Sequence, residues 1–207
     1  MPNVKPDSDD TSGLLERVRA GDRQALDSLL QRHRSALRAF IDFHLDPRLR
    51  KRFDPSDVVQ ETQLDVLRQI DGFLERRPMP FHIWVRKTAY QRLIRLRRDH
   101  VTTGRRSVER EAAWPDRSSL VLARSMLDGK PSPSTAAEAR ELADAVSRAV
   151  ADLSEADREI LLLRDADALP YEEIACLLEI DAAAARKRYG RALIRLQKIL
   201  SARGLLE

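Results

Sequence analysis

A cationic segment near the C-terminus is the part of the sequence whose composition most directly implies a chemistry. Residues 186–198 contain six lysines and arginines and no acid, whereas residues 137–181 contain thirteen acids and four bases. In a helix, which turns by about 100° per residue, one stripe carries Ala185, Tyr189, Ala192, Leu196 and Ile199. The opposite side carries Lys187, Arg188, Arg191, Arg195 and Lys198. Such a face suits DNA, because neutralising phosphates releases their counterions. An ordinary solvated helix face is the alternative.

Two helices with a short connection would position these cations. Pro170 predicts the start of a short helix over residues 171–178, and Asp181 can cap the basic helix that follows. The connecting residues Glu179, Ile180 and Asp181 give the spacing of a helix-turn-helix motif. This layout favours a DNA-binding motif over a plain helical hairpin.

A second candidate interface lies on a helix predicted from Asp54 to about Leu74, with Asp54 as its N-cap and Pro55 in its first turn. One face of this helix is expected in the core and carries Val59, Thr62, Val66, Ile70 and Phe73. The opposite face carries Asp57, Gln60, Glu61, Leu64 and Arg68. Acids around an exposed leucine suit the arginines of a partner protein. The same acids would also complement the helix dipole, so both interpretations stay open.

Aromatic and cationic residues are mixed in residues 81–106. This segment holds eight of the lysines and arginines against one acid, and three of the ten aromatic residues. Rings that stack on bases, beside cations that follow the backbone, are typical of single-strand binding. We expect Phe81 to belong to the core. Trp84 shares a polar-edged stripe with Thr88, Gln91 and Arg95, which leaves Trp84 open between core packing and base stacking.

Composition restricts the class of protein that positions these faces. The chain has 207 residues, 43% hydrophobic and 34% charged, with 5% aromatic residues and seven glycines. These values favour small helical domains over a β-sandwich or barrel. No apolar run approaches the roughly 20 residues that span a bilayer, and the N-terminus lacks a signal peptide, so we expect a cytoplasmic protein without membrane insertion. The single cysteine, Cys176, excludes an internal disulfide and a cysteine-based zinc cluster, and we expect it to be a packing residue rather than a redox switch.

The predicted fold is all-α, with two small helical domains joined by a flexible linker. Residues 1–11 are expected to form a disordered tail, and helical periodicity starts at Ser12 and continues to about Arg52. The first domain is predicted over residues 12–107 and the second over residues 137–207. Residues 108–136 are assigned to the linker because prolines and serines accumulate there.

Three segments, taken in order, resemble the signatures of bacterial sigma factors of the extracytoplasmic-function group. Residues 54–62, DPSDVVQET, are similar to the signature of conserved region 2. Residues 81–85, FHIWV, are similar to the start of the promoter-melting helix. Residues 153–196 resemble region 4, with an L-S-x-x-x-R-E start, then Y-E-E-I-A, then the basic helix. The ordered set is specific, although each motif alone is widespread.

The resemblance implies a sigma factor that performs no catalysis, needs no cofactor or metal, and directs core RNA polymerase to promoters. The domain at 12–107 would bind polymerase and recognise and melt the minus-10 element, and the domain at 137–207 would recognise the minus-35 element. The implied partners are promoter DNA, the β′ clamp and β flap of core polymerase, and an anti-sigma factor.

The resemblance also implies a role for particular residues. Contacts to polymerase would be made by Asp54, Asp57, Gln60, Glu61 and Leu64. Contacts to the minus-10 element would be made by Trp84, Lys87, Thr88, Gln91, Arg95 and Arg98. Contacts to the minus-35 element would be made by Arg186, Lys187, Arg188, Arg191 and Arg195.

The sequence departs from the family pattern at several positions. Glu179 stands at a turn position where the family usually has glycine, and a left-handed residue there costs roughly 1 kcal/mol. Residues 182–185 are four alanines, which offer no side-chain groups to base edges, so readout would depend on phosphates and DNA shape. Gln91 and Leu67 replace the more common asparagine and tryptophan, which leaves the minus-10 preference open.

Two other classes of function are consistent with parts of the sequence. A stand-alone transcriptional regulator could use the 137–207 domain, with the first domain as a sensor or dimeriser. An enzyme acting on nucleic acid is disfavoured, because the four histidines lack the spacing of metal ligands; these are His33, His44, His82 and His100.

Overall fold

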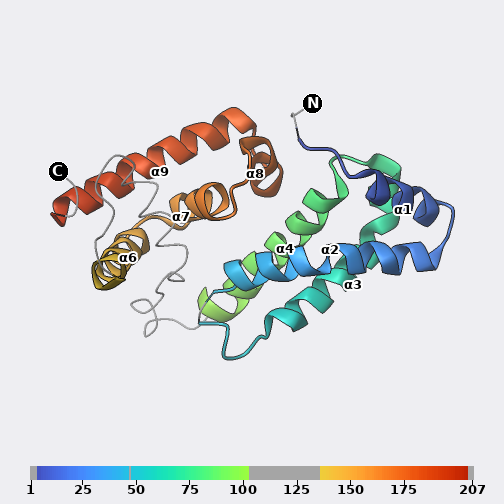
Figure 1. The fold of residues 1–207 in the computed structure, drawn as a ribbon, viewed down its shortest axis with the longest axis horizontal. Helices are drawn as coiled ribbons and strands as arrows, with labels where there is room; N and C mark the ends of the chain where they lie inside the picture. The colour runs from blue at the N-terminus through green and yellow to red at the C-terminus, as the bar shows by residue number, and fades with distance from the viewer. Residues whose placement is uncertain (1–3, 47, 103–135, 205–207) are drawn as a thin grey trace. The chain divides into compact units, whose positions relative to one another are not determined.

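The computed structural model describes residues 4–46, 48–102 and 136–204, and within these ranges the chain is helical and contains no strand (Figure 1). The all-α fold predicted from the sequence is therefore confirmed for the described part of the chain. The chain divides into two compact units, residues 1–107 and 108–207, each described here by itself. The linker predicted over residues 108–136 lies outside the described residues, except that Ala136 already begins a helix.

In its described residues, the first unit is a bundle of four α-helices, α1 (Asp9–Arg19), α2 (Arg23–His44), α3 (Pro55–Arg76) and α4 (Phe81–Arg97). Three of them begin at side-chain N-caps, Ser8, Asp22 and Asp54. Gly21 forms the tight turn between α1 and α2 with a φ of 88°, which favours glycine. The helical periodicity up to Arg52 overestimates α2, which ends at His44 and is followed by turns.

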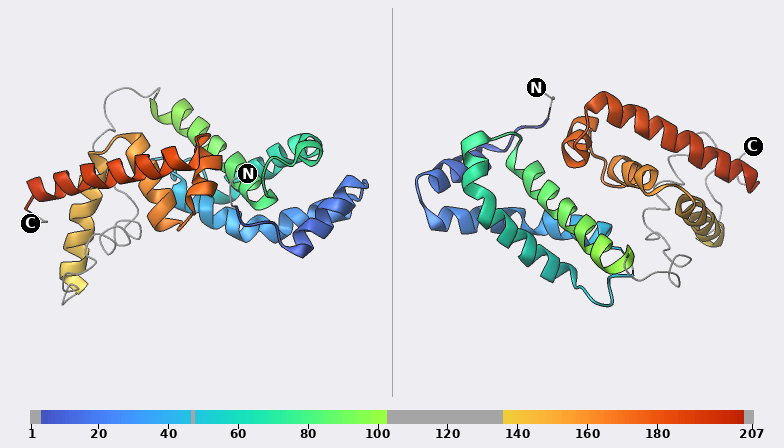
Figure 2. Two further views of the ribbon diagram at one scale, coloured as in Figure 1. Left: turned by 90° about the horizontal axis from the view of Figure 1, so that it is seen from above. Right: turned by 180° about the vertical axis from the view of Figure 1, so that it is seen from behind.

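The core of the first unit forms where α2, α3 and α4 pack against one another (Figure 2). Leu29 and Ile41 of α2, Val66 of α3, and Phe81 and Ile83 of α4 are fully buried. Phe81 is thus a core residue, as predicted. After α4 the chain continues as one π-helical turn, η1 (Arg98–Thr102).

The prediction of a disordered tail over residues 1–11 is wrong for residues 7–11, which take part in the folded unit. Helix α1 begins at Asp9, and Thr11 is buried. The carboxylate of Asp7 accepts hydrogen bonds from the backbone N–H groups of Phe81 (2.8 Å) and His82 (3.4 Å) at the start of α4. Pro80, at the N-cap position of α4, makes no side-chain capping bond. Asp7 therefore caps α4 from a distant part of the sequence.

The second unit consists of α6 (Ala136–Ala151), α7 (Glu155–Leu161), the π-helical turn η2 (Leu162–Ala166), α8 (Tyr171–Leu178) and α9 (Ala182–Ala202). Helix α9 packs against α6, α7 and α8, and α8 lies at the N-terminal end of α9 (Figures 1 and 2). Fully buried side chains from α7, η2, α8 and α9 form its core, namely Ile160, Leu161, Leu163, Ile174 and Leu196.

The α8–α9 pair has the predicted helix-turn-helix connection. Glu179 closes α8 in the left-handed conformation, with φ 56° and ψ 41°. The N–H of Ile180 donates to the carbonyl of Ala175 at 3.1 Å, which secures the turn. Asp181 then caps α9, accepting a hydrogen bond from the N–H of Ala184 at 2.6 Å. The three-residue turn is retained without glycine.

Candidate nucleic-acid and protein interfaces

The outer face of α3 presents the residues that the sequence assigned to polymerase. Asp54, Asp57, Gln60, Glu61 and Leu64 are all exposed, and Leu64 is 49% exposed. The opposite face of α3 is buried as predicted. Asp54 has a structural task as well, because its Oδ1 accepts a hydrogen bond from the N–H of Ser56 at 2.7 Å. That backbone hydrogen bond lowers the pKa of Asp54.

An arginine of α4 ties the acidic face of α3 to the next helix. Arg92 forms ion pairs with both Glu61 and Asp65 of α3, and its Nε lies 3.0 Å from Oδ2 of Asp65. The side chains of Arg92 and Asp65 are only 18% and 11% exposed. Arg68 adds a weaker contact to Asp65 at 3.3 Å. The ion pair with Arg92 therefore constrains the position of Glu61 from α4. Sequence reasoning did not identify the roles of Arg92 and Asp65.

The predicted minus-10 residues of α4 differ in how far their side chains are exposed. Arg95 and Arg98 are exposed, while Lys87 and Gln91 are partly exposed. Trp84 is also partly exposed, and its ring stacks on Phe73 with a centroid separation of 4.3 Å and an interplanar angle of 17°. One face of the Trp84 ring is thus packed against α3, while the side chain stays partly exposed.

Thr88 is the exception among the predicted minus-10 residues, and its assignment is corrected. The Thr88 side chain is buried, and its Oγ1 donates a hydrogen bond to the carbonyl of Trp84 at 2.9 Å. The periodicity that grouped Thr88 with Trp84 assumed one buried stripe. Because α4 packs against both α2 and α3, a wider part of its circumference is buried.

The cations of α9 also fall into distinct environments. Lys187, Arg191 and Lys198 are exposed on the face opposite Ala185, Ala192 and Leu196, which are fully buried. Arg186 is exposed as well, but its guanidinium lies over the ring of Tyr171 in α8, 5.0 Å from the centroid. The side of α9 that was predicted to face DNA therefore carries exposed cations, and Arg186 lies at the edge of that side.

Arg188 and Arg195 differ from the other cations because both bind α7. The Arg188 Nε donates to the carbonyl of Ala156 at 3.1 Å, and its Nη2 lies 3.8 Å from Glu159. The Arg195 Nη1 lies 2.5 Å from Oδ2 of Asp157, a carboxylate that is 5% exposed. Both arginines were predicted to contact DNA, and the structure gives them partners within their own unit.

Two further polar contacts in the second unit were not identified from the sequence. The hydroxyl of Tyr189 donates to Oδ1 of Asp165 at 2.7 Å, joining α9 to η2. The other oxygen of Asp165 is buried without a hydrogen-bond partner. Burial raises the pKa of Asp165, and burial together with the neighbouring carboxylate raises that of Tyr189.

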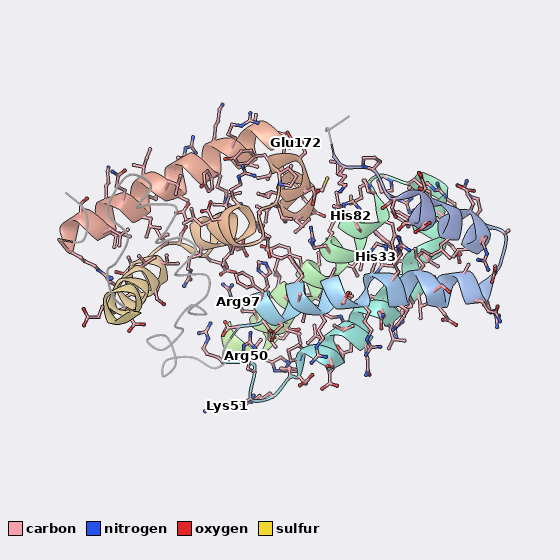
Figure 3. All side chains as sticks on the ribbon, in the orientation of Figure 1. His33, Arg50, Lys51, His82, Arg97 and Glu172 are labelled. Carbon is pink, nitrogen blue, oxygen red and sulfur yellow. The ribbon has the colours of Figure 1, made fainter. Side chains whose placement is uncertain are left out.

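His33 and His82 lie beside each other in the first unit (Figure 3). The His82 Nδ1 is 3.2 Å from Oδ1 of Asp7, and the His33 Nε2 is 3.4 Å from the hydroxyl of Thr11. The His33 ring also packs edge-on against Phe81. Burial lowers the pKa of His33 below its ordinary value of 6.5. These contacts fasten the N-terminal segment to α2 and α4.

Comparison with known proteins places these surfaces in a family context. The family model "Sigma-70, region 4" matches residues 143–196, which include α7, α8 and most of α9. The "ECF RNA polymerase sigma-E factor" of Escherichia coli strain K12 and that of Salmonella typhi are each 26% identical over 180 residues. These alignments cover 86% of this chain and 88% of either relative. The sigma-E factor of Haemophilus influenzae is also 26% identical over 180 residues, and that alignment covers 86% of this chain and 89% of the relative.

A solved structure shares the fold over almost the whole chain. The structure of CnrH in complex with the cytosolic domain of CnrY aligns with a TM-score of 0.55 and 23% identity, covering 94% of this chain and 99% of that chain. The segment matched by region 4 contains the helix-turn-helix, and the curated relatives extend the likeness through the first unit. By these findings residues 143–196 match region 4 of sigma-70 factors, and the chain as a whole is similar to sigma factors of the extracytoplasmic-function group.

Proposed function

We propose that the chain directs core RNA polymerase to specific promoters and starts transcription there by recognising the minus-35 and minus-10 elements and opening the strands. The observation that carries this proposal is the pair of α3 and α9 faces, in a chain that resembles sigma-E factors over 86% of its length. The α3 face is acidic with an exposed leucine, which suits a basic protein partner. The α9 face is cationic and opposite its packing stripe, which suits DNA phosphates.

Each surface has a proposed role. Docking on the β′ clamp would use Asp54, Asp57, Gln60, Glu61 and Leu64. Trp84, with Lys87, Gln91, Arg95 and Arg98, would bind the minus-10 element, and the second unit would approach the β flap while α9 binds the minus-35 element. The chain would make and break no bond itself and would act in the cytoplasm, where polymerase is found. The solved relative CnrH is bound to the cytosolic domain of CnrY, and we propose an analogous protein partner, an anti-sigma factor, for this chain.

Transcription from purified components tests the proposal. Core polymerase and the full chain should produce promoter-directed transcripts from fragments of the source genome, mapped by sequencing their starts. The double variant Asp57→Arg and Glu61→Arg should lose both transcription and co-purification with core polymerase. A matched double reversal at exposed positions elsewhere, Asp27→Arg and Glu75→Arg, should retain both. Absence of any promoter-directed transcript with the unmodified chain would refute the proposal.

A stand-alone regulator makes the opposite prediction in a footprint. The proposed sigma factor should protect promoter DNA only together with core polymerase. Protection of the same duplex by the chain alone, unchanged by added polymerase, would favour the regulator.

A further inference from the structure

This inference deepens the proposed function and rests on it. We propose that only part of the α9 cationic surface binds DNA: Lys187, Arg191 and Lys198 contact phosphates, whereas Arg188 and Arg195 are positioning residues that fix α9 on α7. Lys198 was not among the residues that the family resemblance assigned to the minus-35 element, and two of the residues that were, Arg188 and Arg195, are given a different task here.

The arrangement of the cations around the helix supports this division. With about 100° per residue, Lys187, Arg191 and Lys198 lie within about 40° of one another. That group lies opposite the buried stripe of Ala185, Ala192 and Leu196. Arg188 and Arg195 are rotated from Lys187 by about 80–100°, toward the buried stripe. They therefore stand at the boundary between the exposed face and the packed face.

The contact between Arg195 and Asp157 is the stronger of the two attachments. Asp157 is almost fully buried, and its Oδ2 accepts from the hydroxyl of Ser154 at 2.8 Å and from Arg195 at 2.5 Å. Burial alone would raise the pKa of Asp157, but the hydrogen bonds from Ser154 and Arg195 outweigh it and lower the pKa. The Arg195 side chain is itself 58% exposed. Turning it to a phosphate would nevertheless leave a buried carboxylate without its cation, which is strongly unfavourable.

Arg188 makes a second attachment one heptad earlier. Its guanidinium donates to the Ala156 carbonyl and approaches Glu159, so it too is bound to α7. Two attachments seven residues apart on one helix fix both its rotation and its position along its own axis. The exposed Lys187, Arg191 and Lys198 are thereby held in one orientation.

The salt dependence of DNA binding separates contact residues from positioning residues. Core polymerase carrying the full chain is titrated onto a labelled promoter duplex at several salt concentrations, and binding is followed by fluorescence anisotropy. Lys187→Ala, Arg191→Ala and Lys198→Ala should each reduce the slope of log affinity against log salt by about 1. Arg188→Gln and Arg195→Gln should weaken binding by the same factor at every salt concentration and leave the slope at its wild-type value.

A double variant keeps the test independent of folding defects. Arg195→Gln leaves Asp157 buried without its cation and should lower the thermal midpoint of the second unit. Adding Asp157→Asn removes that charge, so the double variant should recover both the midpoint and the DNA affinity. Recovery of the midpoint with affinity still low, and a slope reduced by about 1, would identify Arg195 as a phosphate contact and overturn the inference.

Different results would overturn the proposed function and the inference. If none of the substitutions in α9 changes the slope or the affinity, α9 does not bind DNA, and the proposed minus-35 role falls together with the division. If all five cations change the slope equally, the minus-35 role stands and only the division is overturned.

Discussion

Replacing Asp7 by alanine should release the start of α4, although the two lie 74 residues apart in sequence. Asp7 supplies the capping acceptor that Pro80 lacks. Its carboxylate accepts hydrogen bonds from the backbone N–H groups of Phe81 and His82 and also contacts Nδ1 of the His82 ring. Loss of an N-cap costs about 0.5–2 kcal/mol, typically about 1 kcal/mol. For a unit of this size, a loss of about 1 kcal/mol corresponds to a fall of roughly 4–8 °C in thermal midpoint.

The predicted loss can be measured at the residues concerned. Calorimetry of the full chain should show a lower midpoint for the first unit, and amide exchange should show faster exchange at Phe81 and His82. Asp27→Ala, which removes an exposed acid within α2, is the matched control and should leave both unchanged. In the Asp7→Ala background, Pro80→Ser should restore much of the protection, because residue 80 already has an N-cap conformation, with φ −56° and ψ 146°.

The contribution of Asp7 should also depend on pH. Burial acts to raise its pKa, but hydrogen bonds from His82 and from the backbone of Phe81 and His82 lower it below 3.8. The contribution is therefore present above about pH 4 and disappears as the pH falls through the lowered pKa. An Asp7→Ala variant that matches the wild type in midpoint and in exchange at neutral pH would refute the capping argument.

Three further predictions concern buried polar groups. Arg92→Ala should destabilise the first unit by about 3–5 kcal/mol in urea unfolding, because Asp65 loses its buried cation; a loss below about 1 kcal/mol would contradict this. The pKa of His33 is lowered in the folded chain, so the wild type loses free energy of unfolding as the pH falls from 6.5 toward that pKa. His33→Gln removes this group and should make the free energy of unfolding depend less on pH below 6.5; an unchanged dependence would contradict the argument. Tyr189→Phe should cost the second unit about 1–3 kcal/mol in thermal unfolding, because both oxygens of Asp165 are then buried without a donor, and no loss would show that the pair is dispensable.

Features determined by neighbouring residues could be predicted from the sequence. The caps Asp54 and Asp181 were identified because a capping side chain bonds to N–H groups two or three residues ahead. The two faces of α3 followed from its 3.6-residue period, because the apolar residues that repeat at this spacing are the ones that α3 buries.

Features that join distant segments could not be predicted in the same way. Nothing in the polar residues 1–11 marks Asp7 as a cap for α4, since the pairing exists only once the bundle has formed. The cations of α9 look equivalent by type and spacing, yet Arg188 and Arg195 lie within reach of α7. Thr88 was predicted to lie at an interface because the periodicity of one helix does not show that both α2 and α3 pack against α4.

The left-handed Glu179 bears on how freely this turn can change during evolution. A side chain in that conformation costs about 1 kcal/mol relative to glycine. Glycine at the same position loses about 0.5–1 kcal/mol through the greater freedom of its unfolded chain. The second term offsets only part of the first, so Glu179 carries a small net cost that the rest of this unit tolerates. The helix-turn-helix of this chain therefore forms without glycine at position 179, and motif searches that demand glycine would overlook chains of this kind.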